Sequence, residues 1–195
     1  MDFLYSIDVS LFRFINETLS NPVGDVLWPL ITDYDKLLPV RIVLVLVWFG
    51  LLVKGGRTGR TVALLLIPVL LCADTISSKI IKELVGRIRP CGVLEHVHLL
   101  VNCGTGKSFP SSHAVNNFAV ATLFSLYYRR WMWAFAAWAS LVAFSRPAVG
   151  VHYPSDILAG ALFGVLLALL LIASWRVLEK KLLPQGSTNE SRNRE

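Results

Sequence analysis

The chain has 195 residues, a length that suits one domain or two very small ones. Hydrophobic residues make up 54% of it and charged residues only 16%, whereas a soluble globular chain is about 45–50% apolar and about 25% charged. With a mean hydropathy of +0.58, this composition indicates a membrane protein and excludes an intrinsically disordered chain, and three cysteines are too few for a disulfide scaffold. The net charge of +6 predicts contact with something negative, either nucleic acid, anionic lipid or a phosphorylated substrate.

The N-terminal segment, residues 8–35, is predicted to lie at the membrane surface. Residues 8–20 are amphipathic, and their apolar face is formed by Leu11, Phe12, Ile15 and Leu19. We expect an interfacial helix capped by Asp8, although an ordinary packed helix explains the pattern equally well. The Asn21-Pro22 pair then breaks the helix.

Downstream, five apolar stretches are candidates for membrane spans, which need about 20 apolar residues each. They are residues 37–53, a stretch from 61 that turns polar after 73, and residues 114–128, 131–144 and 157–175. We therefore predict an all-α fold: an integral membrane helical bundle of about five transmembrane helices after the interfacial helix. Residues 1–183 would form one membrane-embedded domain with an outer loop at 91–109, and residues 184–195 a disordered tail.

Basic residues divide into two groups under this topology. One group would lie on the cytoplasmic side, as the positive-inside rule expects: Lys54, Arg57, Arg60, Arg129, Arg130, Arg176, Lys180 and Lys181. The other falls on the opposite side: Lys79, Lys82, Arg87, Arg89, Lys107 and Arg146. Because the rule does not explain positive charge there, a phosphate-binding site is the interpretation we favour.

Three short segments carry the chemistry, and the first contains Lys82, Arg89 and Pro90. Seven residues are two helical turns, so Lys82 and Arg89 are expected to point the same way from the end of the second span until Pro90 stops the helix. A lysine point charge and an arginine fork suit a dianionic phosphate. The alternative is a pair of cations that extend to the membrane edge.

The second segment, residues 109–113, precedes the third span. Ser111 or Ser112 is expected to cap the following helix, whose free N–H groups and positive dipole end favour an anion. His113 would lie in the first turn and face the same position. An ordinary serine cap with an interfacial histidine is the alternative.

The third segment contains Arg146, which closes the fourth span, together with His152 and Asp156. A carboxylate four residues after a histidine can hold one imidazole nitrogen and leave the other free to attack. The alternative is an acidic residue that favours a helix start beside a histidine of the loop.

All three segments fall at helix ends on the same side of the membrane. Two arginines, a lysine, two histidines, an aspartate and serine donors form the equipment for phosphoryl transfer through a covalent phosphohistidine. No carboxylate cluster or Cys/His spacing predicts a metal site, so we expect no metal and no cofactor.

The Lys82–Pro90, Pro110–His113 and Ser145–Asp156 segments resemble the three signature motifs of the type 2 phosphatidic acid phosphatase family, whose superfamily includes lipid phosphate phosphatases and vanadium haloperoxidases. The resemblance implies roles for the site residues. They are His152 as nucleophile, Asp156 as its orienting partner, His113 as general acid, and Lys82, Arg89, Arg146, Ser111 and the N–H of residue 112 as phosphate ligands. Ser112 replaces the usual glycine, and it would be strained if the backbone needs a positive φ there.

Two cysteines, Cys91 and Cys103, flank the outer loop. A disulfide between them would persist outside the cytoplasm, and two free thiols are the alternative.

We predict a membrane lipid phosphatase at the periplasmic side of a bacterial inner membrane, with a lipid phosphate and membrane lipids as partners and no nucleic acid. The candidate substrates are undecaprenyl diphosphate, phosphatidylglycerol phosphate, phosphatidic acid and lipid A phosphates. A phosphatase of a soluble ester and a non-catalytic lipid-binding scaffold on the same fold remain alternatives.

Overall fold

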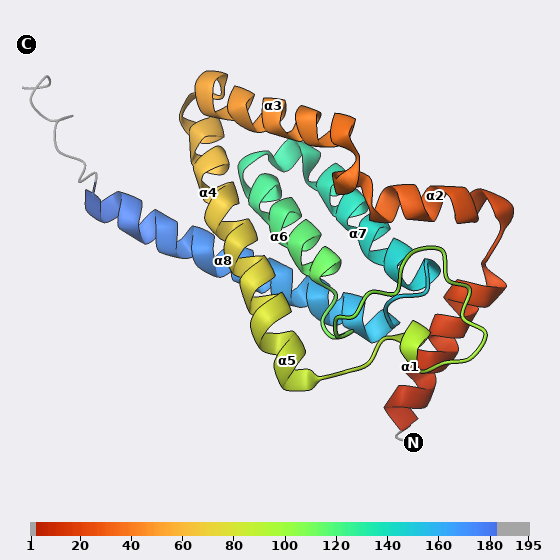
Figure 1. Ribbon diagram of the computed structural model, residues 1–195. Coiled ribbons are helices and arrows are strands. Elements are labelled where there is room, and N and C mark those ends of the chain that lie inside the picture. Colours follow the sequence, from red (N-terminus) through yellow and green to blue (C-terminus); the bar gives the residue numbers. More distant parts are fainter. Residues whose placement is uncertain (1–2, 183–195) are drawn as a thin grey trace, which may run out of the picture.

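Every regular element in the part of the chain that the computed structural model describes, residues 3–182, is a helix (Figure 1). The α-helices are α1 (Phe3–Arg13), α2 (Pro22–Thr32), α3 (Leu38–Lys54), α4 (Gly56–Thr75), α5 (Lys82–Val85), α6 (Ser112–Tyr127), α7 (Met132–Ala148) and α8 (Pro154–Leu182). Single π or 3-10 turns occur at η1 (Phe14–Thr18), η2 (Tyr34–Lys36), η3 (Ile76–Ile81), η4 (Pro90–Gly92) and η5 (Arg129–Trp131). The predicted all-α class is confirmed, while the predicted tail, residues 184–195, lies outside the described residues.

The N-terminal segment departs from the prediction in its first helix. Helix α1 begins at Phe3, and Asp8 is a buried residue in its middle, only 8% exposed, so Asp8 is not a cap. The π-helical turn η1 changes the angular register after Arg13, and it turns Asn16 inward while Leu19 stays 45% exposed. The break at Asn21-Pro22 occurs as expected, because the Asn21 side chain accepts a hydrogen bond from Gly24 N (2.9 Å) and caps α2.

All five apolar stretches are helical in the structure. Helix α4 continues through η3 and α5, and the combined run Gly56–Val85 and the run Pro154–Lys181 of α8 are long and apolar enough to cross a membrane. Helices α3, α6 and α7 have 17, 16 and 17 residues, so the number of spans stays a prediction. Side chains 42–47 of α3 are between 48% and 64% exposed although all are apolar, a surface that suits lipid rather than water.

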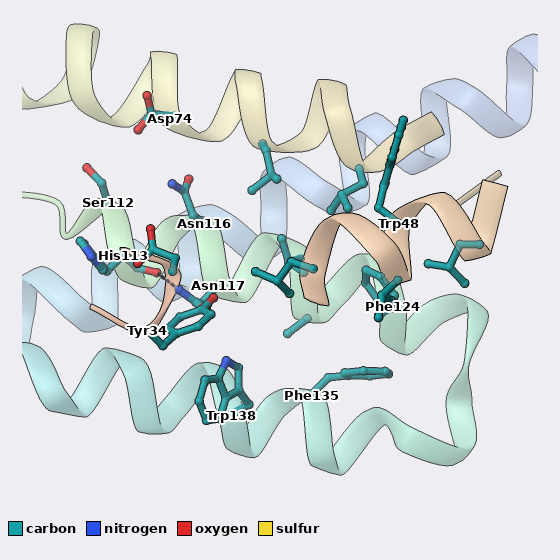
Figure 2. A pocket seen from close by; sticks show the side chains of 18 residues that line it. Tyr34, Trp48, Asp74, Ser112, His113, Asn116, Asn117, Phe124, Phe135 and Trp138 are labelled. Atoms are coloured by element: carbon teal, nitrogen blue, oxygen red, sulfur yellow. Dashed lines mark hydrogen bonds between the residues drawn. The ribbon is translucent and has the colours of Figure 1, made fainter. Parts of the chain in front are cut away.

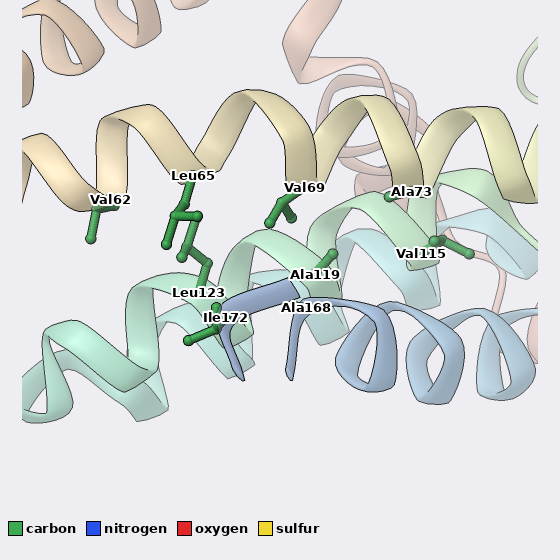
Figure 3. Packing of buried hydrophobic residues seen from close by; sticks show 9 residues of the cluster. All are labelled: Val62, Leu65, Val69, Ala73, Val115, Ala119, Leu123, Ala168 and Ile172. Atoms are coloured by element: carbon green, nitrogen blue, oxygen red, sulfur yellow. The ribbon is translucent and has the colours of Figure 1, made fainter. Parts of the chain in front are cut away.

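Helix α6 lies at the centre of the bundle, between α4, α7 and α8 (Figure 1). A buried cluster joins three of these helices (Figure 3): Val62, Leu65, Val69 and Ala73 of α4, Val115, Ala119 and Leu123 of α6, and Ala168 and Ile172 of α8. Gly160 and Gly164 allow α8 to approach α6 closely, since a Cβ at Gly164 would lie 2.3 Å from Val115 O. The small-residue pattern of α8 therefore serves packing within the chain.

One end of the bundle brings together the end of α5, the start of α6, the end of α7 and the start of α8 (Figure 1). Helix α1 packs against the same end of α8. Backbone hydrogen bonds fix this arrangement, from Ser111 N to Asp156 O (3.1 Å) and from Leu100 N to Val149 O (3.3 Å). The three segments singled out in the sequence thus meet at one end of the molecule.

Candidate active site

Lys82 and Arg89 do not share a helix. Helix α5 ends at Val85, and Gly86 adopts a left-handed conformation (φ 65°) that terminates it, four residues before Pro90. The predicted two-turn spacing is therefore wrong, because glycine at this position stops the helix first. Arg89 is instead held by the loop, with Nε donating to Gly106 O (3.0 Å) and Nη1 to Cys103 O (2.8 Å).

The three predicted cations still converge on one place. Lys82 interacts electrostatically with Arg89, Arg146 and Asp156, and Arg146 also interacts with Arg89. Their mutual repulsion opposes this arrangement, so a dianion bound among them would be stabilised strongly.

A disulfide joins Cys91 and Cys103, whose Cα atoms are 6.1 Å apart. It closes the loop that supplies the Cys103 carbonyl oxygen to Arg89. The bridge therefore restrains one of the three cations as well as the loop itself.

Ser111 occupies the N-cap position of α6 but forms no side-chain cap, and its buried hydroxyl has no partner among the described residues. The expected cap is therefore absent. Ser112 is the first helical residue, and its Oγ lies 3.0 Å from Ser78 Oγ. Among the non-glycine residues that the structure describes, a positive φ occurs at His96 and not at Ser112, so serine is unstrained there.

His152 and Asp156 form a buried pair, 1% and 0% exposed, with His152 Nδ1 3.3 Å from Asp156 Oδ2. Oδ2 also accepts from Ser108 Oγ (2.5 Å) and from Tyr153 N (2.9 Å). Oδ1 accepts from Arg87 Nη1 (2.7 Å). Both carboxylate oxygens are therefore fixed, and Nε2 is the ring nitrogen that faces away from Asp156.

Burial lowers the pKa of His152 to about 4, because a buried imidazole loses the solvation that its protonated form needs. The hydrogen bond to Asp156 acts in the opposite direction, and the charges of Arg146 and Arg89 add to the lowering. The ring is consequently neutral at physiological pH, the form in which a histidine nitrogen is a nucleophile.

Arg146 closes α7 and is 5% exposed. Its Nη1 donates to Thr32 Oγ1 of α2 (2.6 Å), while its Nε is buried without a hydrogen-bond partner in the described part of the chain. Together with the Ser111 hydroxyl, this site holds two buried donors that no group within residues 3–182 satisfies. Because burial of an unpaired donor costs about 1–3 kcal/mol, this pair favours an anionic ligand.

His113 lies in the first turn of α6 and interacts electrostatically with Arg146, His152 and Lys82. It also lines a cavity of about 710 Å³ between α3, α4, α6 and α7 (Figure 2). Polar groups cluster at the His113 end of the cavity: Tyr34, Asp74, Ser112, His113, Asn116 and Asn117. The far end is apolar and includes Trp48, Phe124 and Phe135.

Three residues that the sequence analysis did not place in the site belong to it: Arg87, Ser108 and Asp8. Arg87 had a local signal, since it stands two residues before Arg89 on the side where positive charge is unexpected. Ser108 and Asp8 had none. No group of three or more His, Cys, Asp or Glu side chains within residues 3–182 is arranged to hold a metal ion.

The comparisons with known proteins agree with this geometry. The PAP2 superfamily model matches residues 63–180. Bacitracin transport permease protein BcrC of Bacillus licheniformis is 32% identical over 84% of this chain and 78% of its own length. The putative undecaprenyl-diphosphatase YbjG of Escherichia coli is 26% identical over 92% of this chain and 88% of its own. The crystal structure of Aquifex aeolicus LpxE superposes with a TM-score of 0.70 at 25% identity, over 86% of this chain and 95% of that one. The resemblance found in the sequence is thereby confirmed, and the chain belongs to the PAP2 superfamily as a membrane phosphatase.

Proposed function

We propose that the protein is a lipid phosphatase that removes the terminal phosphate of undecaprenyl diphosphate through a phosphohistidine at His152. The observation that carries this proposal is the buried, neutral His152 held by Asp156 beside the cations Arg89 and Arg146. A histidine–aspartate pair that served structure alone would not need the positive charges of Lys82, Arg89 and Arg146 beside it. Phosphoryl transfer needs them, because they stabilise the charge of the transferred phosphoryl group.

In the first step, His152 Nε2 attacks the terminal phosphorus and the bond from phosphorus to the bridging oxygen breaks. His113 takes up a proton when the anionic substrate offsets the neighbouring charges of Arg146 and Lys82, and it gives that proton to the bridging oxygen. Undecaprenyl phosphate then leaves, and the enzyme carries phosphohistidine. Asp156 accepts the Nδ1 proton in a hydrogen bond and stabilises the positive charge that develops on the ring.

In the second step, a water attacks the phosphorus and gives a proton to His113. The bond from phosphorus to Nε2 breaks, inorganic phosphate leaves, and both histidines return to their starting states. Lys82, Arg89 and Arg146 neutralise the equatorial oxygens in both steps. The Ser111 hydroxyl, which has no partner within residues 3–182, and the N–H groups at the start of α6 supply further hydrogen bonds.

The cavity beside His113 supports a lipid substrate over a soluble ester. It follows α6 from His113 to Phe124, which at about 1.5 Å per residue is roughly 17 Å, close to half of a hydrocarbon core about 30 Å thick. A phosphate at His113 would therefore sit near one membrane surface with its chain in the adjoining leaflet. The positive-inside distribution of basic residues supports placing this site at the periplasmic surface of a bacterial inner membrane.

Undecaprenyl diphosphate is the first choice of substrate because the relative that aligns over 92% of this chain carries that activity in its name. Phosphatidylglycerol phosphate, phosphatidic acid and lipid A phosphates remain competing substrates, since the motifs bind the phosphate and not the lipid. A soluble ester would fill the polar end of the cavity only.

A substrate panel on purified protein in detergent tests the proposal. We expect the highest kcat/KM with undecaprenyl diphosphate, lower values with the other lipids, and the lowest with a soluble ester. His152→Ala should abolish release of phosphate, whereas His96→Asn, at an exposed loop histidine with φ 57°, should keep it. Near-normal turnover by His152→Ala would refute the mechanism. No phosphate release from any substrate would favour the non-catalytic scaffold.

A further inference from the structure

Helix α1 reaches into the active site through one buried carboxylate. Asp8 Oδ2 accepts from Arg87 Nη2 (2.6 Å) and from Ser155 Oγ (2.5 Å), and Oδ1 accepts from Ser155 N (2.9 Å). Asp8 is thus tied both to the loop before the outer disulfide and to the first turn of α8. Burial of a carboxylate in an amphipathic helix costs folding free energy unless the charge is paired and hydrogen-bonded, as it is here.

Arg87 continues the connection toward the nucleophile. Its Nη2 binds Asp8, its Nη1 binds Asp156 Oδ1 (2.7 Å), and its guanidinium carbon lies 3.9 Å from the centre of the Tyr153 ring. The two carboxylates therefore hold the two arms of one guanidinium, and the ring beneath fixes its plane. We propose that Asp8 is a positioning residue that, acting through Arg87, holds Asp156 in the orientation that His152 needs.

The charges explain why both carboxylates are required. With Asp8 in place, the positive charge of Arg87 is shared between two anions, and its pKa is raised: burial alone would lower it, but the hydrogen bonds and charges of Asp8 and Asp156 outweigh burial. Without the Asp8 charge, Arg87 would pair with Asp156 alone. It would then compete with His152 for that carboxylate, and its Nη2 arm would lose its partner while Nη1 still donates to Ser155 Oγ (2.7 Å).

The docking of α1 does not depend on Asp8 alone. Tyr5 Oη lies 3.3 Å from Tyr153 Oη, and Phe12 packs against the Tyr153 ring at 5.7 Å between centroids. Farther along, Asn16 Nδ2 donates to Ala148 O (3.0 Å). Removal of the Asp8 charge should therefore leave α1 in place and alter the orientation of Asp156. Asp8 and the other contacting groups of the N-terminal segment, Tyr5, Phe12 and Asn16, precede the matched family region, residues 63–180.

A double-mutant cycle of Asp8→Asn and Arg87→Gln tests the proposal, which rests on the proposed role of His152. We expect Asp8→Asn to lower kcat about 10- to 100-fold, the loss that follows a misplacement on the order of 1 Å, with KM and the inhibition constant of inorganic phosphate unchanged. A merely structural role would alter the phosphate affinity as well. Arg87→Gln should lower kcat similarly, and the double variant should lose little more than either single variant.

The matched control is Glu17→Gln, which removes an exposed carboxylate that pairs with Arg13 in the same segment, and it should keep the wild-type kcat. Asp8→Glu keeps the buried charge but moves the carboxylate by one methylene, so it supplies the same kcat and KM comparison should Asp8→Asn not fold. A wild-type kcat for both Asp8 variants, or effects of Asp8→Asn and Arg87→Gln that multiply, would overturn the proposal. Turnover by His152→Ala would instead overturn the proposed function and leave the hydrogen-bond network without a catalytic role.

Discussion

Replacement of Gly164 by alanine should damage both stability and catalysis. The added Cβ would lie 2.3 Å from Val115 O and 3.0 Å from Ala119 N, whereas an ordinary contact begins at 3.4 Å. Because both neighbours are backbone atoms of α6, no side chain can move away to make room. The two helices must therefore separate by about 1 Å at this point.

That separation reaches the active site, since α6 carries Ser111 and His113 at its start and α8 carries Asp156. The hydrogen bond from Ser111 N to Asp156 O, 3.1 Å long, would lengthen as the two helices separate. Overpacking of this kind costs typically 1–3 kcal/mol of stability, and a misplacement of about 1 Å costs up to about 100-fold in rate.

Thermal unfolding and kcat of Gly164→Ala in detergent measure the two effects. Gly50→Ala is the control, because a Cβ at Gly50 on α3 has no heavy atom within 4 Å; it should leave kcat unchanged and should not lower Tm, since alanine favours a helix over glycine by about 1 kcal/mol. A wild-type Tm and kcat for Gly164→Ala would refute the close packing of α8 on α6.

The remaining predictions concern charge and protonation. Lys82→Ala should remove about 2–4 kcal/mol of transition-state stabilisation, which lowers kcat/KM in a phosphate-release assay by roughly 30- to 1,000-fold. An unchanged kcat/KM would remove Lys82 from the site. NMR titration of the His152 ring should give a pKa of about 4, and a value near 6.5 would contradict its burial. Because the unfolded ring takes up a proton near pH 6.5 and the folded ring near 4, stability should also fall as the pH is lowered through this window, measured as Tm. Phosphate release should persist with a chelator and stop with vanadate. Loss of activity restored by a divalent metal would show that the protein cations do not suffice.

The helices were predictable because their signal is local. Long uninterrupted apolar stretches indicate helices whatever they pack against, and each of the five stretches is helical. Their ends were harder to place, because α8 continues past residue 175 to Leu182 through charged residues that are themselves good helix formers.

Parts of the candidate site were equally readable. His152 and Asp156 lie four residues apart, and they are in contact across the start of α8, with His152 in the preceding loop. The expected geometry of Lys82 and Arg89 was wrong because it assumed a helix up to Pro90, whereas Gly86 ends the helix earlier. The two cations still meet, since the loop returns Arg89 to the same place.

The contacts of α1 could not be predicted. Asp8 and Arg87 are 79 residues apart in the chain, and no local pattern links them. From the sequence, Asp8 is a plausible helix cap, because a short acid before an amphipathic stretch is typical of one. Only the packing of α1 against the start of α8 reveals it as a buried partner of Arg87.

The central claim is the covalent phosphohistidine at His152, and trapping it tests that claim most directly. Purified enzyme mixed with undecaprenyl diphosphate, quenched at alkaline pH within one turnover and digested should yield one phosphorylated peptide, with the phosphate on His152. The His152→Ala variant should yield none. A phosphate on another residue, or a substrate turned over by the His152→Ala variant, would contradict the account.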